Sequence, residues 1–251
     1  MNKYLQYTII ISISVISLYF AFSGEDIHLI ISEIKKVKIS GILLASIILL
    51  LSCLIRAYRW KLLIKPLEQL NLKHVFSATM IGYFGNGVLA FRLGELLKSY
   101  SVAKNTNLKI SQAIGTVILE RILDLLMVFL MGLILVPWIP NQFSQVKSTL
   151  FVLFIFTIVF IVVIVSIKKL KYNLGKKYLN YFLSKNNKVF VHFKNVFDGL
   201  KVIFENKHLK SILFSSIILW ITYFVVTLII LKSCSIELKL SDASILFILG
   251  S

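Results

Sequence analysis

Charged side chains are scarce in this sequence, and acidic side chains are the scarcest. Asp, Glu, Lys and Arg make up 16% of the 251 residues, and only 11 residues are Asp or Glu. A soluble domain carries about 25% charged residues, because charge keeps its surface in contact with water. This composition therefore excludes a soluble enzyme and an intrinsically disordered chain.

Cysteine and catalytic motifs are also lacking. The two cysteines, Cys53 and Cys234, lie within or at the edge of apolar runs and are far apart in the chain. They exclude a disulfide scaffold and give no support to metal or redox chemistry. The sequence contains no GxSxG, HExxH, GxxxxGKS/T or GxGxxG motif, which are signatures of hydrolases, zinc enzymes and nucleotide-binding proteins. We therefore expect no catalytic residue, no metal ion and no cofactor.

Long apolar runs are abundant. Hydrophobic side chains make up 58% of the chain, and six stretches of at least 17 residues carry no charge. About 17 to 25 apolar residues suffice to cross a bilayer as a helix. The sequence therefore predicts an all-α polytopic membrane protein, a single transmembrane domain over residues 1–251 with about six transmembrane helices. The expected helices are residues 4–22, 39–55, 113–138, 148–167 and 211–231, with residues 243–251 as the beginning of a last helix, cut off at residue 251.

One further apolar run, residues 75–91, differs from the others because it contains three glycines around Asn86. Glycine at this density makes a continuous helix unfavourable, since each glycine costs about 1 kcal/mol relative to alanine. We therefore predict a re-entrant hairpin over residues 75–91 that is broken at its glycines, with Asn86 at the tip. Such a hairpin needs protein or a water-filled cavity around its backbone. A slanted helix that crosses the whole membrane is the alternative.

The distribution of Lys and Arg over the connections favours the hairpin. Residues 56–73 hold five basic side chains, residues 92–109 hold four and residues 168–210 hold eleven, whereas residues 137–147 hold one. Basic loops stay on the cytoplasmic side of a membrane. A hairpin places all three basic connections on that side, and a full crossing does not. The expected location is the plasma (inner) membrane, multi-pass, with the N-terminus in the cytoplasm.

The basic connection 168–210 also contains an amphipathic pattern. Five apolar residues recur at spacings of three and four and so share one helical face: Phe190, Phe193, Phe197, Leu200 and Phe204. We predict an amphipathic surface helix over about residues 186–206, with its basic residues toward anionic headgroups. A solvated loop that obeys the charge rule is the alternative. The net charge of +17 does not call for nucleic acid as a partner, because the membrane accounts for it.

Arginine is rare, and its four positions lie within one third of the chain: Arg56, Arg59, Arg92 and Arg121. Lysine supplies all the other basic side chains. Arginine carries a planar, permanently charged fork that binds carboxylate or phosphate through two hydrogen bonds, which an ammonium group cannot do. These positions therefore indicate either ion pairs or an anion site.

Three charged residues interrupt the run 113–138. Glu120 and Asp124 are four residues apart and share a helical face, and Arg121 lies within reach of Asp124. A charge inside the membrane costs a few kcal/mol unless it is paired or faces a cavity. We expect Arg121 and Arg92 to be the partners of Asp124, with Arg59 at a wetter rim where its replacement leaves folding intact. A structural ion-pair network and a headgroup site are both compatible with this pattern.

Three blocks of this sequence resemble a known family. Residues 56–60 (RAYRW), 86–95 (NGVLAFRLGE) and 119–124 (LERILD) are similar in order and spacing to the lysylphosphatidylglycerol synthase transmembrane-region family, also called flippase-like domain proteins. Ala90 stands where the family pattern has a proline. Family members generally continue into a second hairpin, and we expect full transport to need it.

The resemblance implies an inner-membrane protein that binds or translocates a polar lipid. In the two-domain synthases this region is joined to a soluble aminoacyl-transferase domain, which no part of this chain could form, so lysyl transfer is not expected. The expected partners are the bilayer and an anionic or polyprenyl-linked lipid; an oligomer is compatible with the sequence. The expected substrate-binding residues are Arg56, Arg59, Asn86, Arg92, Glu95, Glu120, Arg121 and Asp124.

Two alternatives stay open. A membrane enzyme that modifies a lipid headgroup could use Glu120 or Asp124 as a base, although no nucleophile or metal set accompanies them. A noncatalytic scaffold subunit would use the same charges only to hold the hairpin in place.

Overall fold

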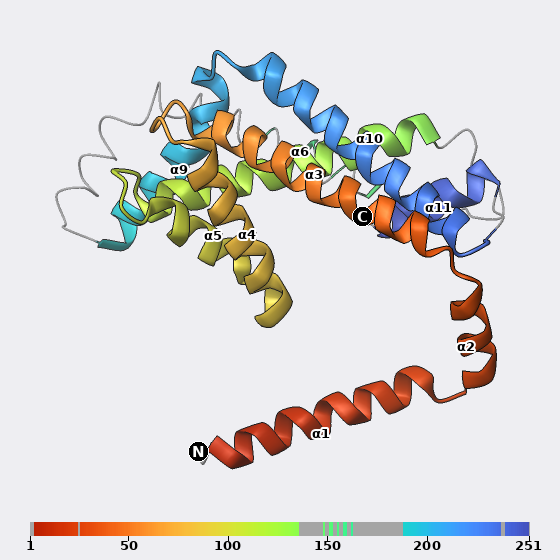
Figure 1. The fold of residues 1–251 in the computed structure, drawn as a ribbon. Coiled ribbons are helices and arrows are strands. Elements are labelled where there is room, and N and C mark those ends of the chain that lie inside the picture. The colour runs from red at the N-terminus through yellow and green to blue at the C-terminus, as the bar shows by residue number, and fades with distance from the viewer. Residues whose placement is uncertain are drawn as a thin grey trace.

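The computed structural model describes residues 3–24, 26–135, 188–236 and 239–250, together with a few single positions between 148 and 162. Within these residues every regular element is a helix, which confirms the all-α prediction (Figure 1). The helices are α1 (Lys3–Phe22), α2 (Ile27–Lys36), α3 (Ile39–Ile64), α4 (Leu72–Val88), the short 3-10 helix η1 (Ala90–Arg92), α5 (Gly94–Ala103), α6 (Ile110–Leu135), α9 (Lys188–Glu205), α10 (Leu209–Ser233) and α11 (Leu240–Gly250).

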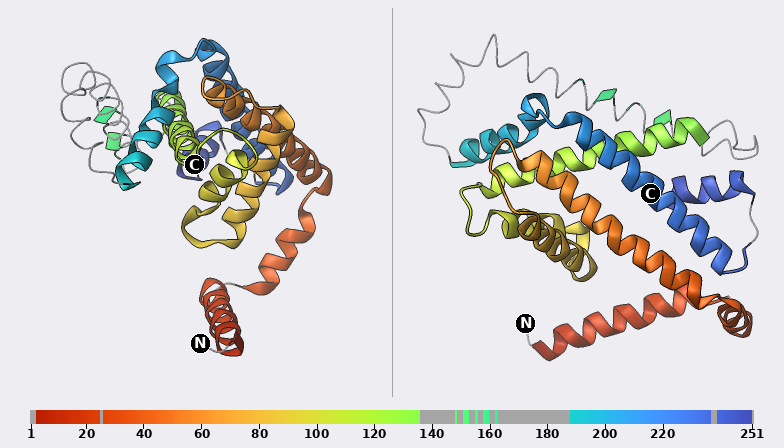
Figure 2. Two further views of the ribbon diagram at one scale, coloured as in Figure 1. Left: turned by 90° about the vertical axis from the view of Figure 1, so that its left-hand side faces the viewer. Right: turned by 45° about the horizontal axis from the view of Figure 1, so that its top comes forward.

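The long helices α3, α6 and α10 form the body of the molecule (Figure 2). Helices α3 and α10 are antiparallel and pack along their length, from Gly41 beside Ser233 to Arg59 beside Ser216. The apolar core gathers toward the end of this bundle where α3 finishes. It joins α3, α4, α5, α6 and α10 through buried side chains that include Trp60, Leu63, Val75, Val102, Ala113 and Ile212.

Helix α1 confirms the helix expected at residues 4–22, and it lies apart from the bundle in both views (Figures 1 and 2). The helix that follows it was not predicted. Helix α2 begins at Ile27 and is capped by Asp26, whose carboxylate accepts hydrogen bonds from the backbone N–H groups of His28 and Leu29. This N-cap satisfies donors that would otherwise lack a partner and allows a short helix in a polar connection.

Two of the described helices, α3 and α10, are long and apolar enough to cross a membrane, and a bent pair made from α1 and α2 would be a third. Helix α6 is as long as α3 but carries Glu120, Arg121 and Asp124 in its middle. The predicted span 148–167 falls largely outside the described residues. The expected count of about six spans therefore stays a prediction.

Helix α3 is longer than its apolar run. The second apolar run ends at residue 55, and the residues that follow predict a basic and aromatic anchor at the membrane surface: Arg56, Arg59, Trp60 and Lys61. Instead the helix continues to Ile64, and the side chains of Arg56, Arg59 and Trp60 are buried. The anchor interpretation is wrong, because the last turns of α3 face α6 and α10 rather than lipid headgroups.

A helical hairpin is present, but its break is not at the glycines. Helix α4 runs through all three glycines without interruption and ends at Val88. The chain then turns at residues 89–93, where Phe91 and Arg92 adopt positive φ angles of 56° and 55°, and α5 returns alongside α4. The hairpin therefore extends from residue 72 to residue 103, and Asn86 lies in the last turn of α4 rather than at the tip.

The glycines form the contact between the two limbs of the hairpin. A Cβ atom added to Gly94 would overlap the carbonyl oxygen of Gly82 and the backbone nitrogen of Asn86. A Cβ atom added to Gly85 would come within 2.8 Å of the Gly94 Cα atom. Glycine is required here because the two backbones lie closer than any side chain permits.

Both limbs of the hairpin reach the same end of the bundle, in agreement with the charge distribution. Glu68, just before α4, accepts a 3.1 Å hydrogen bond from the backbone N–H of Asn107, just after α5. Asn206, between α9 and α10, donates a 2.8 Å hydrogen bond to the carbonyl oxygen of Leu62. We call this end of the molecule, formed by residues 65–71, 104–109 and 206–208, the basic end.

Helix α9 confirms the helix expected over about residues 186–206, and it packs against α6. Its buried side carries Asn195, Gly199 and Val202. A Cβ atom on Gly199 would overlap the carbonyl oxygen of Gln112, so the two helices approach closely. Of the predicted apolar stripe, Leu200 packs against the apolar core, whereas Phe204 is 38% exposed. One side of α9 therefore packs closely against α6.

Candidate functional site

Helix α6 carries the charged residues at the centre of the site. Glu120 and Asp124 face the other helices, and their residues are 0% and 8% exposed. A buried carboxylate has to be matched by cations and hydrogen bonds, because its loss of hydration is otherwise unfavourable. The surrounding helices α3 and α5 supply those cations.

Glu120 is held by cations from two helices. Lys98 of α5 lies 2.5 Å from Glu120 Oε2, and Arg59 of α3 lies 3.3 Å from Glu120 Oε1. Arg56, one turn before Arg59, is 3.5 Å from the same oxygen. Both carboxylate oxygens are therefore engaged.

Asp124 is shared among three arginines. Arg59 approaches it to 2.7 Å, Arg121 to 3.3 Å and Arg56 to 3.5 Å. The expected partner Arg121 is confirmed. The expected partner Arg92 is wrong, since Arg92 forms no ion pair within the described part of the chain and lies in the exposed turn between α4 and α5.

Arg59 is the most deeply buried of the arginines, which corrects its expected place at a wetter rim. Its residue is 0% exposed, and it also donates a 3.2 Å hydrogen bond to Ser216 of α10. The sequence alone could not show which arginine is the more deeply buried, because Arg56 and Arg59 lie one turn apart on the same helix. Arg59 ties α3 to both α6 and α10.

Lys98 is a member of the site that the sequence did not reveal. It is 4% exposed, and its ammonium group lies 4.0 Å above the ring of Trp60. Trp60 in turn donates a 3.1 Å hydrogen bond to Thr116. A lysine among many lysines carries no distinguishing signal, although its position four residues after Gly94 and three after Glu95 could have placed it on the inner face of α5. We call Arg59, Lys98 and Glu120 the closed group.

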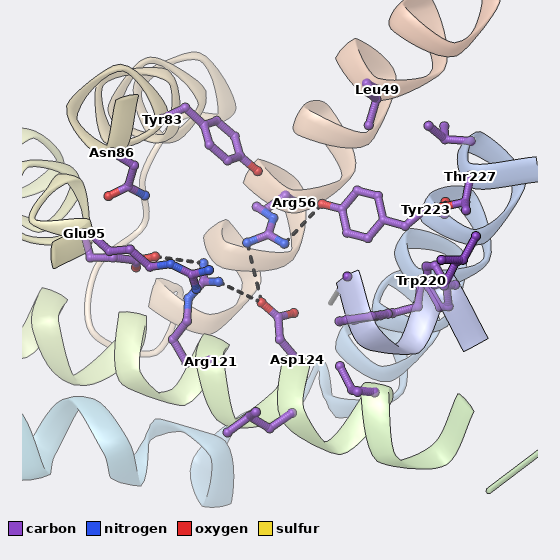
Figure 3. Close-up of a pocket in the computed structure, with 17 residues that line it drawn as sticks. Leu49, Arg56, Tyr83, Asn86, Glu95, Arg121, Asp124, Trp220, Tyr223 and Thr227 are labelled. Carbon is purple, nitrogen blue, oxygen red and sulfur yellow. Dashed lines mark hydrogen bonds and ion pairs between the residues drawn. The ribbon is translucent and has the colours of Figure 1, made fainter. Parts of the chain in front are cut away.

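A cavity of about 750 Å³ opens beside the closed group. Its polar side is formed by side chains from α3, α4, α5, α6 and the hairpin turn (Figure 3): Arg56, Asn86, Arg92, Glu95, Arg121 and Asp124. Six of the eight expected site residues therefore line one cavity. The other two, Arg59 and Glu120, lie behind it in the closed group. We call Asn86, Arg92, Glu95 and Arg121 the cavity wall.

The cavity wall has polar atoms without partners. Arg121 forms a 3.1 Å ion pair with Glu95 Oε1, but Glu95 Oε2 and Asn86 Oδ1 are buried and accept no hydrogen bond. Asp124 Oδ2 also accepts none, although arginines lie nearby. Buried acceptors without a donor are uncommon in native proteins. These three acceptors therefore lack the donor that a buried oxygen normally has.

The other side of the cavity is aromatic and apolar. Tyr223 of α10 accepts a 3.1 Å hydrogen bond from Arg56, and Tyr83 of α4 lies on the other side of that guanidinium, 6.0 Å from ring centre to Arg56 Cζ (Figure 3). Trp220 packs edge to face against Phe247 of α11. The lining also includes Thr227 and Gly250 and six apolar residues: Leu49, Leu125, Val128, Val226, Leu246 and Phe247. The cavity thus has one charged end and one apolar end.

The charges around the cavity leave an excess of positive charge. Four cations, Arg56, Arg59, Lys98 and Arg121, surround three carboxylates, Glu95, Glu120 and Asp124. Arg92 adds another positive charge at the mouth without an ion-pair partner in the described residues. A site with a net positive charge attracts an anion. The paired N–H donors of an arginine side chain match phosphate in particular.

Comparisons with known proteins place this chain in a group of membrane proteins. The family model of the lysylphosphatidylglycerol synthase TM region matches residues 7–251. A UPF0104 membrane protein of Methanocaldococcus jannaschii is 31% identical over 119 residues, which are 46% of this chain and 35% of that protein. The matched part thus spans about a third of that relative's length. No solved structure matches the chain.

Proposed function

Because the chain belongs to the lysylphosphatidylglycerol synthase transmembrane-region family, we propose that it is a lipid-handling membrane protein that binds a polar lipid in the charged cavity. The observation that carries the proposal is the division of that cavity into a charged end and an apolar end. A membrane lipid has the same division, and a soluble metabolite does not. The volume of about 750 Å³ lies within the range of ligand pockets, about 300 to 1,000 Å³.

The cavity wall is suited to a phosphate-containing headgroup. Arg92 has no competing carboxylate within the described residues, so its fork is free for the phosphate. The carboxylate of Glu95 and the amide of Asn86, which line the cavity, would bind an amine or hydroxyl group on the same headgroup. The apolar side chains beyond Trp220 would contact the hydrocarbon tail.

We further propose flippase-like translocation of that lipid between leaflets. The hairpin α4–α5 returns to the basic end, so its turn with Arg92 stops part of the way along the bundle. A polar cavity that begins at this turn would give a headgroup a path that avoids hydrocarbon. We propose that the basic end faces the cytoplasm, as the positive-inside rule predicts.

The enzyme alternative is less well supported by the geometry. Glu120 is sealed from the cavity and engaged by several cations, so it cannot reach a headgroup as a base. Asp124 does line the cavity, but three arginines pair with it, and no serine, cysteine or lysine is among the cavity-lining residues of the described chain.

The test uses the purified chain reconstituted in liposomes that carry a trace of a fluorescent phospholipid or polyprenyl-linked lipid. The rate at which an impermeant reductant destroys the fluorescence of the inner leaflet reports translocation, and native mass spectrometry reports bound lipid. We expect bound lipid in every preparation and exchange above the rate of empty liposomes. Folded protein that retains no lipid and exchanges none of the classes tried would favour the scaffold alternative, whereas a changed lipid inventory would favour the enzyme.

A further inference from the structure

A second cavity, of about 650 Å³, lies at the basic end of the molecule. It is enclosed by the end of α5, the loop 104–109, the beginning of α6 and one side of α9. None of its lining residues lines the charged cavity described above. From Glu95 to Ala103, α5 advances by eight residues, so the two cavities are separated by about 12 Å of helix.

The basic side chains at this second cavity are not matched by acidic ones. Lys104, Lys109 and His192 line it, and none of its lining residues is Asp or Glu. Neither lysine has an ion-pair partner among the residues that the structure describes. The cavity therefore carries a local positive charge that is open to an anion.

Two buried polar groups inside the cavity lack hydrogen-bond partners. Asn195 of α9 and Ser111 of α6 are each 7% exposed, and both line the cavity. Neither forms a side-chain hydrogen bond with any described residue. Neither side chain has a fully buried polar atom without a partner, so their polar atoms remain accessible from the cavity that both residues line. Both groups can donate to an anion that enters the cavity.

Helix α6 adds its N-terminus to the same place. It begins at Ile110, next to Ser111, and extends for 26 residues. The first N–H groups of a helix have no partner within it and carry partial positive charge, which favours a phosphate. Lysine, buried amide, hydroxyl and helix terminus thus converge from three elements.

The remaining walls are apolar, and this feature selects the kind of anion. Leu108, Ile110, Ile114 and Val196 line the cavity, and Tyr100 beside them is 54% exposed. A free phosphate ion would leave these side chains without a function. An anionic lipid would place its phosphate among the donors and its glycerol and first methylene groups against the apolar wall.

We infer that this cavity is a second lipid site, which binds the phosphate group of an anionic phospholipid at the basic end. The site is separate from the charged cavity, and it could hold a lipid whether or not the charged cavity does. It would keep a headgroup about 12 Å from Glu95 along α5. A lipid bound there would lie at the membrane surface, outside the charged cavity.

The experiment uses the full chain in nanodiscs of phosphatidylcholine with a small fraction of phosphatidylglycerol that carries a photoreactive group next to its phosphate. Mass spectrometry then identifies the labelled peptides. We expect label on the peptide that contains residues 104–114. Replacing both lysines, Lys104→Gln with Lys109→Gln, should lower that label by about 25-fold, because each basic residue near an anionic surface contributes about fivefold to lipid affinity.

The matched control is Lys73→Gln with Lys207→Gln, which removes the same charge from exposed positions outside the cavity. We expect it to change the label on residues 104–114 by less than about twofold. An equal loss in both double variants would overturn the inference, because surface charge alone would then explain the labelling. Complete protection by inorganic phosphate, with no preference for labelled phosphatidylglycerol over labelled phosphatidylcholine, would assign the site to a free anion and overturn the lipid. Label on peptides around Glu95 and Arg121 in the same spectra reports the charged cavity independently.

Discussion

The closed group and the cavity wall contain the same kinds of residue but differ in what surrounds them. Arg59, Lys98 and Glu120 are no more than 4% exposed and all their charges are paired. In the cavity wall the side chains of Arg121 and Glu95 are 37% and 22% exposed, and Arg92 is unpaired among the described residues. Asp124 and Arg56 join the two regions.

This difference separates two roles that the same charges could serve. A buried charge held in ion pairs contributes to the structure, because removing one partner leaves the other charge without compensation. A charge at a cavity with an open atom contributes little to folding and is available to a ligand. Substitutions in the two regions should therefore have different outcomes, and the following experiments test that separation.

The largest effect should come from the closed group. Glu120→Ala leaves Lys98 and Arg59 without their shared carboxylate, and the expected loss is about 3 to 5 kcal/mol in the free energy of unfolding. Arg59→Met should lower the free energy of unfolding nearly as much. An arginine at a water-exposed rim could instead be replaced without loss of stability. Folded yield and the thermal midpoint in detergent measure both.

The matched control for Glu120→Ala is Glu33→Ala, whose carboxylate forms an ion pair with exposed Lys36. A surface pair of this kind is worth about 0 to 1 kcal/mol, so the control should fold normally. Comparable midpoints for the Glu120 and Glu33 variants would show that Glu120 is solvated and that the closed group does not exist as described.

The next largest effect should come from the close packing of α4 against α5 at Gly94. This contact holds Asn86 of the cavity wall near Lys98 of the closed group. Gly94→Ala places a Cβ atom against the backbone of α4, and overpacking of this kind costs about 1 to 3 kcal/mol. The hairpin should open and the charged cavity should lose bound lipid. Gly87→Ala is the control, because a Cβ atom there meets nothing within 4 Å and alanine favours the helix. Equal thermal midpoints for the two variants would contradict the close packing of α4 and α5.

A functional effect without a folding effect is expected at the cavity wall. Arg92→Lys keeps the charge but removes the bidentate fork, so lipid binding and exchange should fall by about tenfold, the worth of one hydrogen bond to a charged group. The free energy of unfolding should change by less than about 0.5 kcal/mol, since the side chain is exposed. Unchanged exchange in this variant would remove Arg92 from the headgroup site while leaving the lipid proposal in place.

The smallest perturbation tests where the two regions lie relative to the membrane. Single cysteines at Asn71 and Asn105, in a chain with Cys53 and Cys234 replaced, should react with an impermeant thiol reagent only from the cytoplasmic side. Both positions belong to the basic end, which the Glu68 to Asn107 hydrogen bond holds together. A cysteine at Gln142, outside the described residues, should react from the opposite side. Labelling of Asn71 and Asn105 from opposite sides would make the re-entrant hairpin wrong.

Much of the helical framework followed from the sequence. The apolar runs predicted α1, α3, α6 and α10 because a helix in a membrane needs a continuous apolar surface. The uneven distribution of Lys and Arg predicted that the loops before α4 and after α5 share one end. The four-residue spacing of Glu120 and Asp124 predicted that they act together.

The rest depended on packing that a linear pattern does not encode. Arg59 and Trp60 have the composition of a surface anchor, and only the arrival of α10 against α3 makes them core residues. Glycine in α4 was expected to break the helix, whereas its lack of a side chain serves the approach of α5. Lys98 could not be distinguished from the other lysines before its distance to Glu120 was known.

The order of the charged partners along the chain has a consequence for biosynthesis. The cations that neutralise Glu120 and Asp124 come from α3 and α5, at separations of 61, 65 and 22 residues before them. They have therefore already left the ribosome when α6 emerges. A helix with two carboxylates and one arginine in its middle enters a bilayer poorly when alone, but this one meets its counter-charges in the nascent chain. Ser216 and Tyr223 of α10 arrive later and only complete the hydrogen bonds of arginines that are already neutralised.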